Sequence, residues 1–103
     1  MLKKRRISEK ELKNRVVDYI RRRYPNAWIY KTADIWQSGI PDLLICIYGR
    51  LYAIELKAGK NKPTRIQSHV LCNIFKAGAR VQVCRSLIEV KDFFDRWEVK
   101  DGE

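Results

Sequence analysis

The chain has 103 residues, enough for one domain with one hydrophobic core and too few for a second folding unit. Its 22 Lys and Arg residues outnumber its 12 Asp and Glu residues, which gives a formal net charge of +10. So large an excess on a short chain indicates a polyanionic partner, with nucleic acid favoured over an anionic membrane. A basic protein without such a partner ranks second, because the charge is concentrated in residues 3–6, 21–23 and 57–65.

Three cysteines, Cys46, Cys72 and Cys84, lie far apart and form no CxxC pair, so neither a zinc site nor a disulfide framework is indicated. We expect buried free thiols in a reducing compartment. No apolar run is long enough to cross a membrane, and no signal-peptide core is present. The expected location is intracellular, in the cytoplasm. A virus-encoded protein that acts in its host cell would also fit this expectation.

The first predicted element is a helix that follows a basic tail over residues 1–7. Ser8 opens the helix with Glu11 as its capping-box partner, and apolar residues recur at helical spacing until Pro25 ends it. Aromatic and branched side chains then predict a strand over residues 27–32.

A hairpin follows the loop at residues 33–41. Two apolar strands, residues 42–48 and 51–57, are separated by Gly49-Arg50, and a Gly at the first central position suits a type II′ turn.

A second helix, a strand and a third helix complete the order α-β-β-β-α-β-α. Pro63 fits the first turn of the second helix, which stops at Gly78, and the strand covers residues 79–84. Ser86 and Glu89 form another capping box. The crossover makes the last two strands parallel if they are adjacent, so the expected fold is α/β, with a mixed sheet flanked by helices.

The resulting organisation is a single domain over residues 8–99, with a short tail over residues 100–103.

The hairpin carries charged residues at one end. With Gly49-Arg50 as the turn, Asp42 faces Lys57, and Glu55 and Lys57 project to the same face because they are two residues apart. Asp42 and Glu55 then lie diagonally, with Cα atoms roughly 7–8 Å apart, close enough for both carboxylates to share a cation.

This arrangement indicates a divalent metal. Two carboxylates in one site repel each other, and burial disfavours their charged forms. Oxygen ligands favour Mg²⁺, with Mn²⁺ as a substitute. The ion would acidify a water for attack on a phosphodiester, while the ion and Lys57 stabilise charge on the phosphoryl group. Lys57 could also orient or deprotonate the nucleophile.

A structural alternative is a cross-strand ion pair between Asp42 and Lys57, with Glu55 solvated. It is weaker here because the same face carries Leu44, Cys46 and Ala53, which indicates that the face is covered.

At this point the residues resemble a known family. Gly39-Ile40-Pro41-Asp42, followed by Ile54-Glu55-Leu56-Lys57, resembles the PD-(D/E)XK nuclease signature. With the hairpin spacing and the downstream Pro63-Thr64-Arg65-Ile66-Gln67, it resembles the VRR-NUC branch, which includes small stand-alone phage and bacterial proteins similar to archaeal Holliday-junction resolvases. No core motif position departs from the pattern. The resemblance implies a restriction-endonuclease-like fold, Mg²⁺ dependence and phosphodiester hydrolysis, with Asp42, Glu55 and the backbone carbonyl of Leu56 as metal ligands.

The resemblance also implies an acidic residue on the first helix that reaches the metal or its waters. Glu9 and Glu11 are the candidates. The helical phase favours Glu9, whose angular position around the helix axis lies between those of the apolar Val16 and Ile20. The alternative role for Glu9 is a favourable charge at the helix N-terminus.

The other candidates are polar or basic. Gln67, on the inward face of the second helix, is either an active-site residue bonded to a metal water or phosphate, or a satisfied core residue. Lys31 could touch the scissile phosphate, as the family implies, or stand exposed. Trp36 and Gln37 could pack against DNA or a second subunit. Three further residues could grip the DNA backbone or be solvated: Lys60, Lys62 and Arg65.

The leading hypothesis is an Mg²⁺-dependent structure-specific endodeoxyribonuclease that resolves Holliday junctions. So small a basic domain has little room for sequence readout, and two symmetric cuts imply a homodimer. A flap or nicking nuclease of replication and repair is the nearest rival. A non-catalytic DNA-binding protein is disfavoured because the Asp/Glu/Lys set is intact, and a basic protein that binds RNA or another protein ranks below it.

Overall fold

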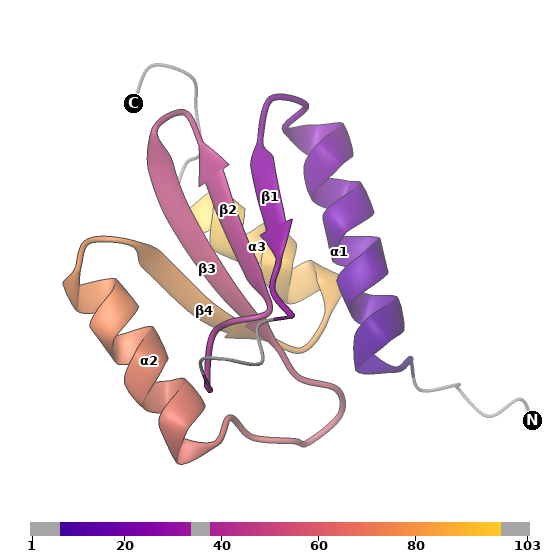
Figure 1. The fold of residues 1–103 in the computed structure, drawn as a ribbon. Helices are drawn as coiled ribbons and strands as arrows, with labels where there is room; N and C mark the ends of the chain where they lie inside the picture. The colour runs from indigo at the N-terminus through magenta and orange to yellow at the C-terminus, as the bar shows by residue number, and fades with distance from the viewer. Residues whose placement is uncertain (1–6, 34–37, 98–103) are drawn as a thin grey trace, which may run out of the picture.

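The computed structural model describes residues 7–33 and 38–97. Within these ranges the predicted order of elements is confirmed (Figure 1). The elements are α1 (Glu9–Arg23), β1 (Trp28–Lys31), β2 (Leu43–Ile47), β3 (Arg50–Leu56), α2 (Arg65–Lys76), β4 (Arg80–Cys84) and α3 (Leu87–Arg96).

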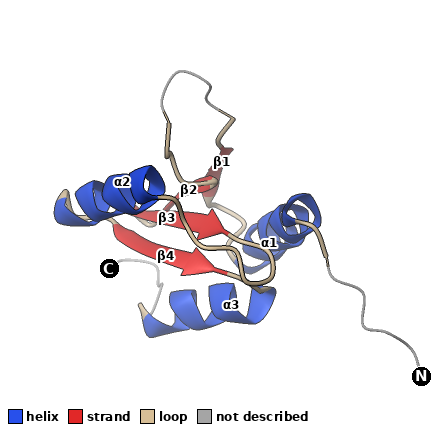
Figure 2. Ribbon diagram, turned by 90° about the horizontal axis from the view of Figure 1, so that it is seen from below, coloured by secondary structure: helices blue, strands red, loops and turns tan. Residues whose placement is uncertain are grey.

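The strands form one mixed sheet in the order β1-β2-β3-β4. The first two pairings are antiparallel, and β3 pairs with β4 in parallel, as expected for a crossover through α2. Helices α1 and α3 lie on one side of the sheet and α2 on the other (Figure 2). The predicted α/β fold with a helix-flanked mixed sheet is therefore confirmed.

The register of the hairpin differs from the prediction by two residues. Ile47 pairs with Arg50, so the turn is Tyr48-Gly49. Both turn residues have positive φ, 51° and 81°, which is the requirement of a type I′ turn and corrects the predicted type II′. Because side chains alternate with a period of two, a two-residue shift leaves every side chain on its predicted face.

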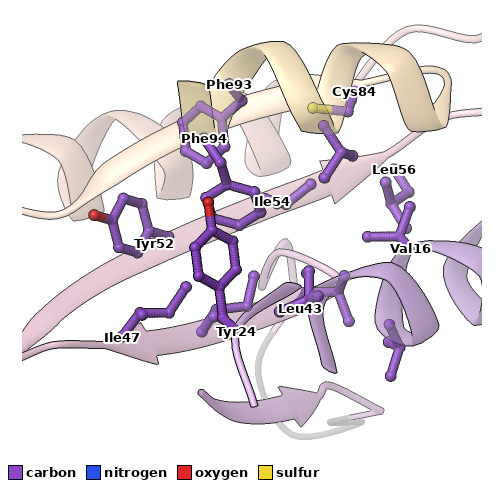
Figure 3. Close-up of a cluster of buried hydrophobic side chains, with 14 of the residues drawn as sticks. Val16, Tyr24, Leu43, Ile47, Tyr52, Ile54, Leu56, Cys84, Phe93 and Phe94 are labelled. Atoms are coloured by element: carbon purple, nitrogen blue, oxygen red, sulfur yellow. The ribbon is translucent and has the colours of Figure 1, made fainter. Parts of the chain in front are cut away.

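The main core lies between the sheet and the pair α1 and α3 (Figure 3). Alternate residues of β2 are buried there, and the rings of Tyr24 and Tyr52 both pack edge-on to Phe94 at centroid distances of 5.4 and 5.5 Å. Leu12, Val16 and Ile20 anchor α1 in this core. These contacts hold α1 firmly against the sheet that carries Asp42 and Glu55.

Three details of the sequence-based interpretation were wrong. Ile7 packs against the core, so it does not belong to the basic tail. Pro63 precedes the N-cap Thr64 and lies outside α2. Cys72 is exposed on α2, whereas Cys84 is buried as expected and Cys46 is half-buried. Across the described ranges, no helix is both long and apolar enough to cross a membrane.

Candidate active site

The loop before Asp42 is held against two neighbouring elements. Thr32, just after β1, donates its hydroxyl to the carbonyl of Pro41 at 2.6 Å and its backbone N–H to the carbonyl of Asp42 at 2.9 Å. Gly39 has φ +83°, and a Cβ there would come within 2.9 Å of the backbone oxygen of Ile66 on α2. A glycine is required here because the loop passes against the first turn of α2.

Asp42 lies at the end of β2, and its carboxylate crosses to β3. The Oδ2 atom accepts a hydrogen bond from the backbone N–H of Leu56 at 2.8 Å. Continuing the observed register by one step places Asp42 directly opposite Glu55, rather than opposite Lys57 as predicted. The two carboxyl groups lie close enough for each to shift the pKa of the other.

Glu55 carries an ionisable side chain and is almost completely buried, with only 2% of the residue exposed. Its Oε2 atom is buried and has no hydrogen-bond partner in the described part of the chain. Burial raises the pKa of Glu55 to about 8, assisted by the hydrogen bond to Asp42 and by the charge of Asp42, while the Lys57 ammonium acts in the opposite direction. The predicted alternative of a solvated Glu55 is therefore wrong.

The pKa of Asp42 shifts in the opposite direction to that of Glu55. Its burial favours the neutral form, but hydrogen bonds from the Glu55 carboxyl and the Leu56 N–H, together with the Lys13 ammonium, lower the pKa of Asp42. Without a metal, the neutral form of Glu55 and the ionised form of Asp42 are therefore favoured below about pH 8. Two adjacent carboxylates that differ in this way have a single shared proton to exchange for a cation.

The first helix brings two charged side chains to this end of the sheet. Glu9 accepts a hydrogen bond from the backbone N–H of Ala58, just beyond β3, at 3.3 Å. Glu11 instead donates its N–H to Ser8 and pairs with Arg15 at 3.9 Å. The helical phase thus identified which acid points toward the sheet.

The second side chain, Lys13, was missed by sequence reasoning. Its Nζ lies 3.5 Å from Oδ1 of Asp42. A usable signal was present, because Lys13 stands four residues after Glu9 and so shares its helix face.

Gln67 has a local structural role that the pattern Thr64-x-x-Gln67 could have predicted. Its Oε1 atom accepts from the backbone N–H of Thr64 at 2.9 Å, and Thr64 Oγ1 accepts from the backbone N–H of Gln67 at 3.1 Å. This capping box starts α2. The oxygen of Gln67 is thus engaged with the helix, and its amide NH₂ group is the part left to contact a water or phosphate.

The predicted DNA-binding residues do not form one cluster. Lys60, Lys62 and Arg65 are exposed between β3 and the first turn of α2. Lys31 is exposed on β1, and its partner Leu43 belongs to the core face, so the register puts Lys31 on the face opposite Glu55. Lys31 could reach a phosphate near Glu55 only around the sheet edge. Trp36 and Gln37 lie outside the described residues.

An arginine that sequence reasoning missed holds the basic loop in place. Arg85, between β4 and α3, donates Nη1 to the backbone carbonyls of Gly59, at 2.9 Å, and Asn61. These bonds fix the segment that carries Lys60 and Lys62 relative to the sheet.

The residues present fit a hard divalent cation. Over the described ranges, no three His, Cys, Asp or Glu side chains gather as a complete ligand set. Mg²⁺ commonly takes only one or two protein carboxylates and keeps several waters. Asp42 and Glu55 supply that number, and the unpartnered buried Oε2 of Glu55 is an oxygen that a cation would satisfy.

Two solved structures are similar to this chain over most of its length. One, described as a VRR_NUC domain, has a TM-score of 0.67 and 27% sequence identity over 82% of this chain and 95% of that chain. The other, described as a VRR_NUC domain protein, has a TM-score of 0.75 and 20% identity over 94% of this chain and 93% of that chain. No family model and no curated protein matches the sequence.

The helix-flanked mixed sheet, with Asp42 opposite Glu55 and a lysine two residues further on, defines a nuclease of the PD-(D/E)XK type. Within that class, the similarity to solved VRR_NUC domains supports membership of the VRR-NUC family.

Proposed function

We propose that the protein is an Mg²⁺-dependent, structure-specific endodeoxyribonuclease that cleaves branched DNA and resolves four-way junctions. The observation that carries the proposal is the Asp42–Glu55 pair, in which a buried carboxyl group with a raised pKa lies beside an ionised one. A buried pair of this kind costs stability unless a cation uses it.

Each residue of the proposed site has a distinct task. Asp42 and Glu55 would hold the ion together with the Leu56 carbonyl, and Mn²⁺ would substitute for Mg²⁺. When bound, the ion supplies Lewis-acid polarisation of the phosphate and lowers the pKa of a water. Lys57, whose charge acts on Glu55, stabilises the negative charge that develops on the phosphoryl oxygens.

The neighbouring groups assist at the rim of this site. Glu9 orients waters near the end of β3, where its carboxylate already meets the N–H of Ala58. The NH₂ group of Gln67 donates to a water or a phosphate oxygen. Lys60, Lys62 and Arg65 bind backbone phosphates on either side of the cut, and Arg85 keeps their loop in place.

A metal-dependent cleavage assay tests the proposal. The protein is incubated with a labelled four-way junction, a 5′ flap and a linear duplex, each with Mg²⁺ or with EDTA. We expect paired, symmetric nicks on the junction with Mg²⁺, no cleavage with EDTA, and little cleavage of the linear duplex.

Other outcomes point elsewhere. Cleavage that survives EDTA rules out the metal mechanism. A preference for the flap, or single nicks on the junction, identifies the flap or nicking nuclease instead. Tight DNA binding without cleavage in Mg²⁺ or Mn²⁺ identifies a non-catalytic DNA-binding protein.

Paired cuts would require two active sites, and we propose that a homodimer supplies them. The α2 side of the sheet is uncovered near its β1 edge, where Trp28 and Tyr30 are 58% and 48% exposed and their rings stack at 5.9 Å. Leu51 of β3 is 42% exposed on the same face. An exposed apolar patch of Trp28, Tyr30 and Leu51, on a chain of net charge +10, suits a second copy better than it suits a polyanion.

Trp28→Glu is expected to weaken the dimer by roughly 30-fold or more, because it places a charge in an apolar contact. The molar mass from light scattering after size exclusion would fall to that of one chain. Ile88→Glu is the matched control, since Ile88 is 69% exposed on α3, away from this face. A wild-type protein that stays monomeric at tens of micromolar, or equal dissociation by Ile88→Glu, contradicts this interface.

A further inference from the structure

A cation of the protein's own already stands beside the carboxylate pair. Lys13 Nζ is 3.5 Å from Asp42 Oδ1, and both side chains are only 25% exposed. The other carboxylate oxygen, Oδ2, is taken by the backbone N–H of Leu56 at 2.8 Å. The Asp42 oxygen not engaged by the backbone is therefore the one that Lys13 contacts.

The position of Lys13 is set by the fold. The preceding residue, Leu12, is 1% exposed in the core, and Glu9, one turn earlier, is bonded to Ala58. The helix is thus fixed to the rest of the fold at two positions just before Lys13. The ammonium is carried by a packed helix whose position brings it within 3.5 Å of Asp42, at the end of β2.

We propose that Lys13 is the resident counter-ion of the metal-free site and that a divalent ion must compete with it for Asp42. The proposal rests on the metal site of the proposed function. A monovalent ammonium and a divalent ion both gain from the single negative charge of Asp42, and they repel each other at short range. Lys13 consequently stabilises the metal-free protein and lowers its affinity for the ion.

The two effects of Lys13 have opposite signs, and this separates the proposal from a purely structural role. A residue that only supports the fold would, when replaced, weaken both stability and metal binding. Loss of a resident counter-ion lowers the stability of the metal-free protein and tightens metal binding. Lys13 thereby acts as a positioning residue, through Asp42, and sets the Mg²⁺ concentration at which the site fills.

The test is calorimetric titration of Mg²⁺, and separately Mn²⁺, into the protein without DNA at fixed pH and ionic strength. Lys13→Met keeps most of the side-chain length and removes the charge. We expect the metal affinity to rise roughly three- to ten-fold. The melting temperature in EDTA should fall by about 2–5 °C. Lys13→Arg, which keeps the charge, should stay near wild type in both measurements.

Lys10→Met is the matched control. Lys10 is an exposed residue of the same helix, so its replacement removes one positive charge from the chain without touching Asp42. We expect its metal affinity to stay within about two-fold of wild type, since solvent and salt weaken the effect of an exposed charge that makes no contact with Asp42. Lys13→Gln provides a second uncharged variant, and circular dichroism verifies that each variant is folded.

Several results would overturn the inference. Equal tightening by Lys10→Met would show a general charge effect, and weaker metal binding in folded Lys13→Met or Lys13→Gln would show that Lys13 assists the ion. Unchanged affinity in these variants, with normal binding in wild type, refutes the counter-ion role alone. A wild-type protein that binds neither ion refutes this inference and the proposed metal site together.

Discussion

Glu55→Gln is expected to lower Mg²⁺-dependent DNA cleavage by at least about 10²–10³-fold. A neutral amide would replace a negatively charged oxygen ligand of the proposed metal ion and so weaken its binding. The fold should survive, since Glu55 is protonated in the metal-free protein and an amide is close to it in size and charge. Single-turnover cleavage of the preferred substrate at saturating protein measures the loss.

The control for this variant is Glu11→Gln. Glu11 lies at the start of α1 and pairs with Arg15, away from Asp42. Its replacement should change cleavage by less than about two-fold, as expected for an exposed ion pair of small energy. Full activity of a folded Glu55→Gln protein would remove Glu55 from the mechanism, and an equal loss in Glu11→Gln would show that the site had been misassigned.

In the absence of metal, the protein is expected to become less stable as the pH rises from about 4.5 to about 8. The pKa of Glu55 is raised to about 8 in the folded protein from 4.5. The folded state therefore binds the proton more tightly than the unfolded state. The resulting stability is fully present below pH 4.5 and is lost as the pH passes through about 8.

The expected loss in the free energy of unfolding is roughly 2–4 kcal/mol, or a fall of about 10–20 °C in Tm. Denaturation in EDTA at a series of pH values measures it. The lowered pKa of Asp42 does not interfere, because that contribution is present above pH 3.8 and is lost only below it. Saturating Mg²⁺ should restore stability at pH 8, since the ion replaces the proton and binds the folded state.

Glu55→Gln serves as the control for this second prediction as well. It should be more stable than wild type at pH 8 in EDTA, should lose the dependence on pH in this range, and should gain little from Mg²⁺. Parallel pH profiles for wild type and Glu55→Gln would show that Glu55 does not carry the effect.

The hairpin shows which features of the site could be predicted from the sequence. The apolar runs in 42–48 and 51–57 predicted two paired strands, and the two-residue period of a strand put Asp42 and Glu55 on one face. The pattern could not choose between turns at Tyr48-Gly49 and Gly49-Arg50, because the two registers differ by two residues and bury the same side chains. The observed register sets Asp42 opposite Glu55 and thereby creates the shared proton.

The sequence by itself determined the order of the elements, the class of the fold and the three motif residues Asp42, Glu55 and Lys57. The elements and the fold class follow from periodicity, caps and turn residues, which act over short stretches of chain. The motif residues stand out as charged residues at one end of an apolar hairpin. Even Gln67 could have been recognised as a cap, since its partner Thr64 is three residues away.

Only the tertiary structure decided the surroundings of the pair. Lys13 forms an ion pair with Asp42, and the backbone N–H of Ala58 donates to Glu9. Arg85 donates to the carbonyl of Gly59. Each of these contacts joins segments that are far apart in the sequence. The raised pKa of Glu55 likewise depends on burial produced by several elements at once. Burial and long-range charge contacts exist only after the helices have packed against the sheet, so no local pattern in the chain could specify them.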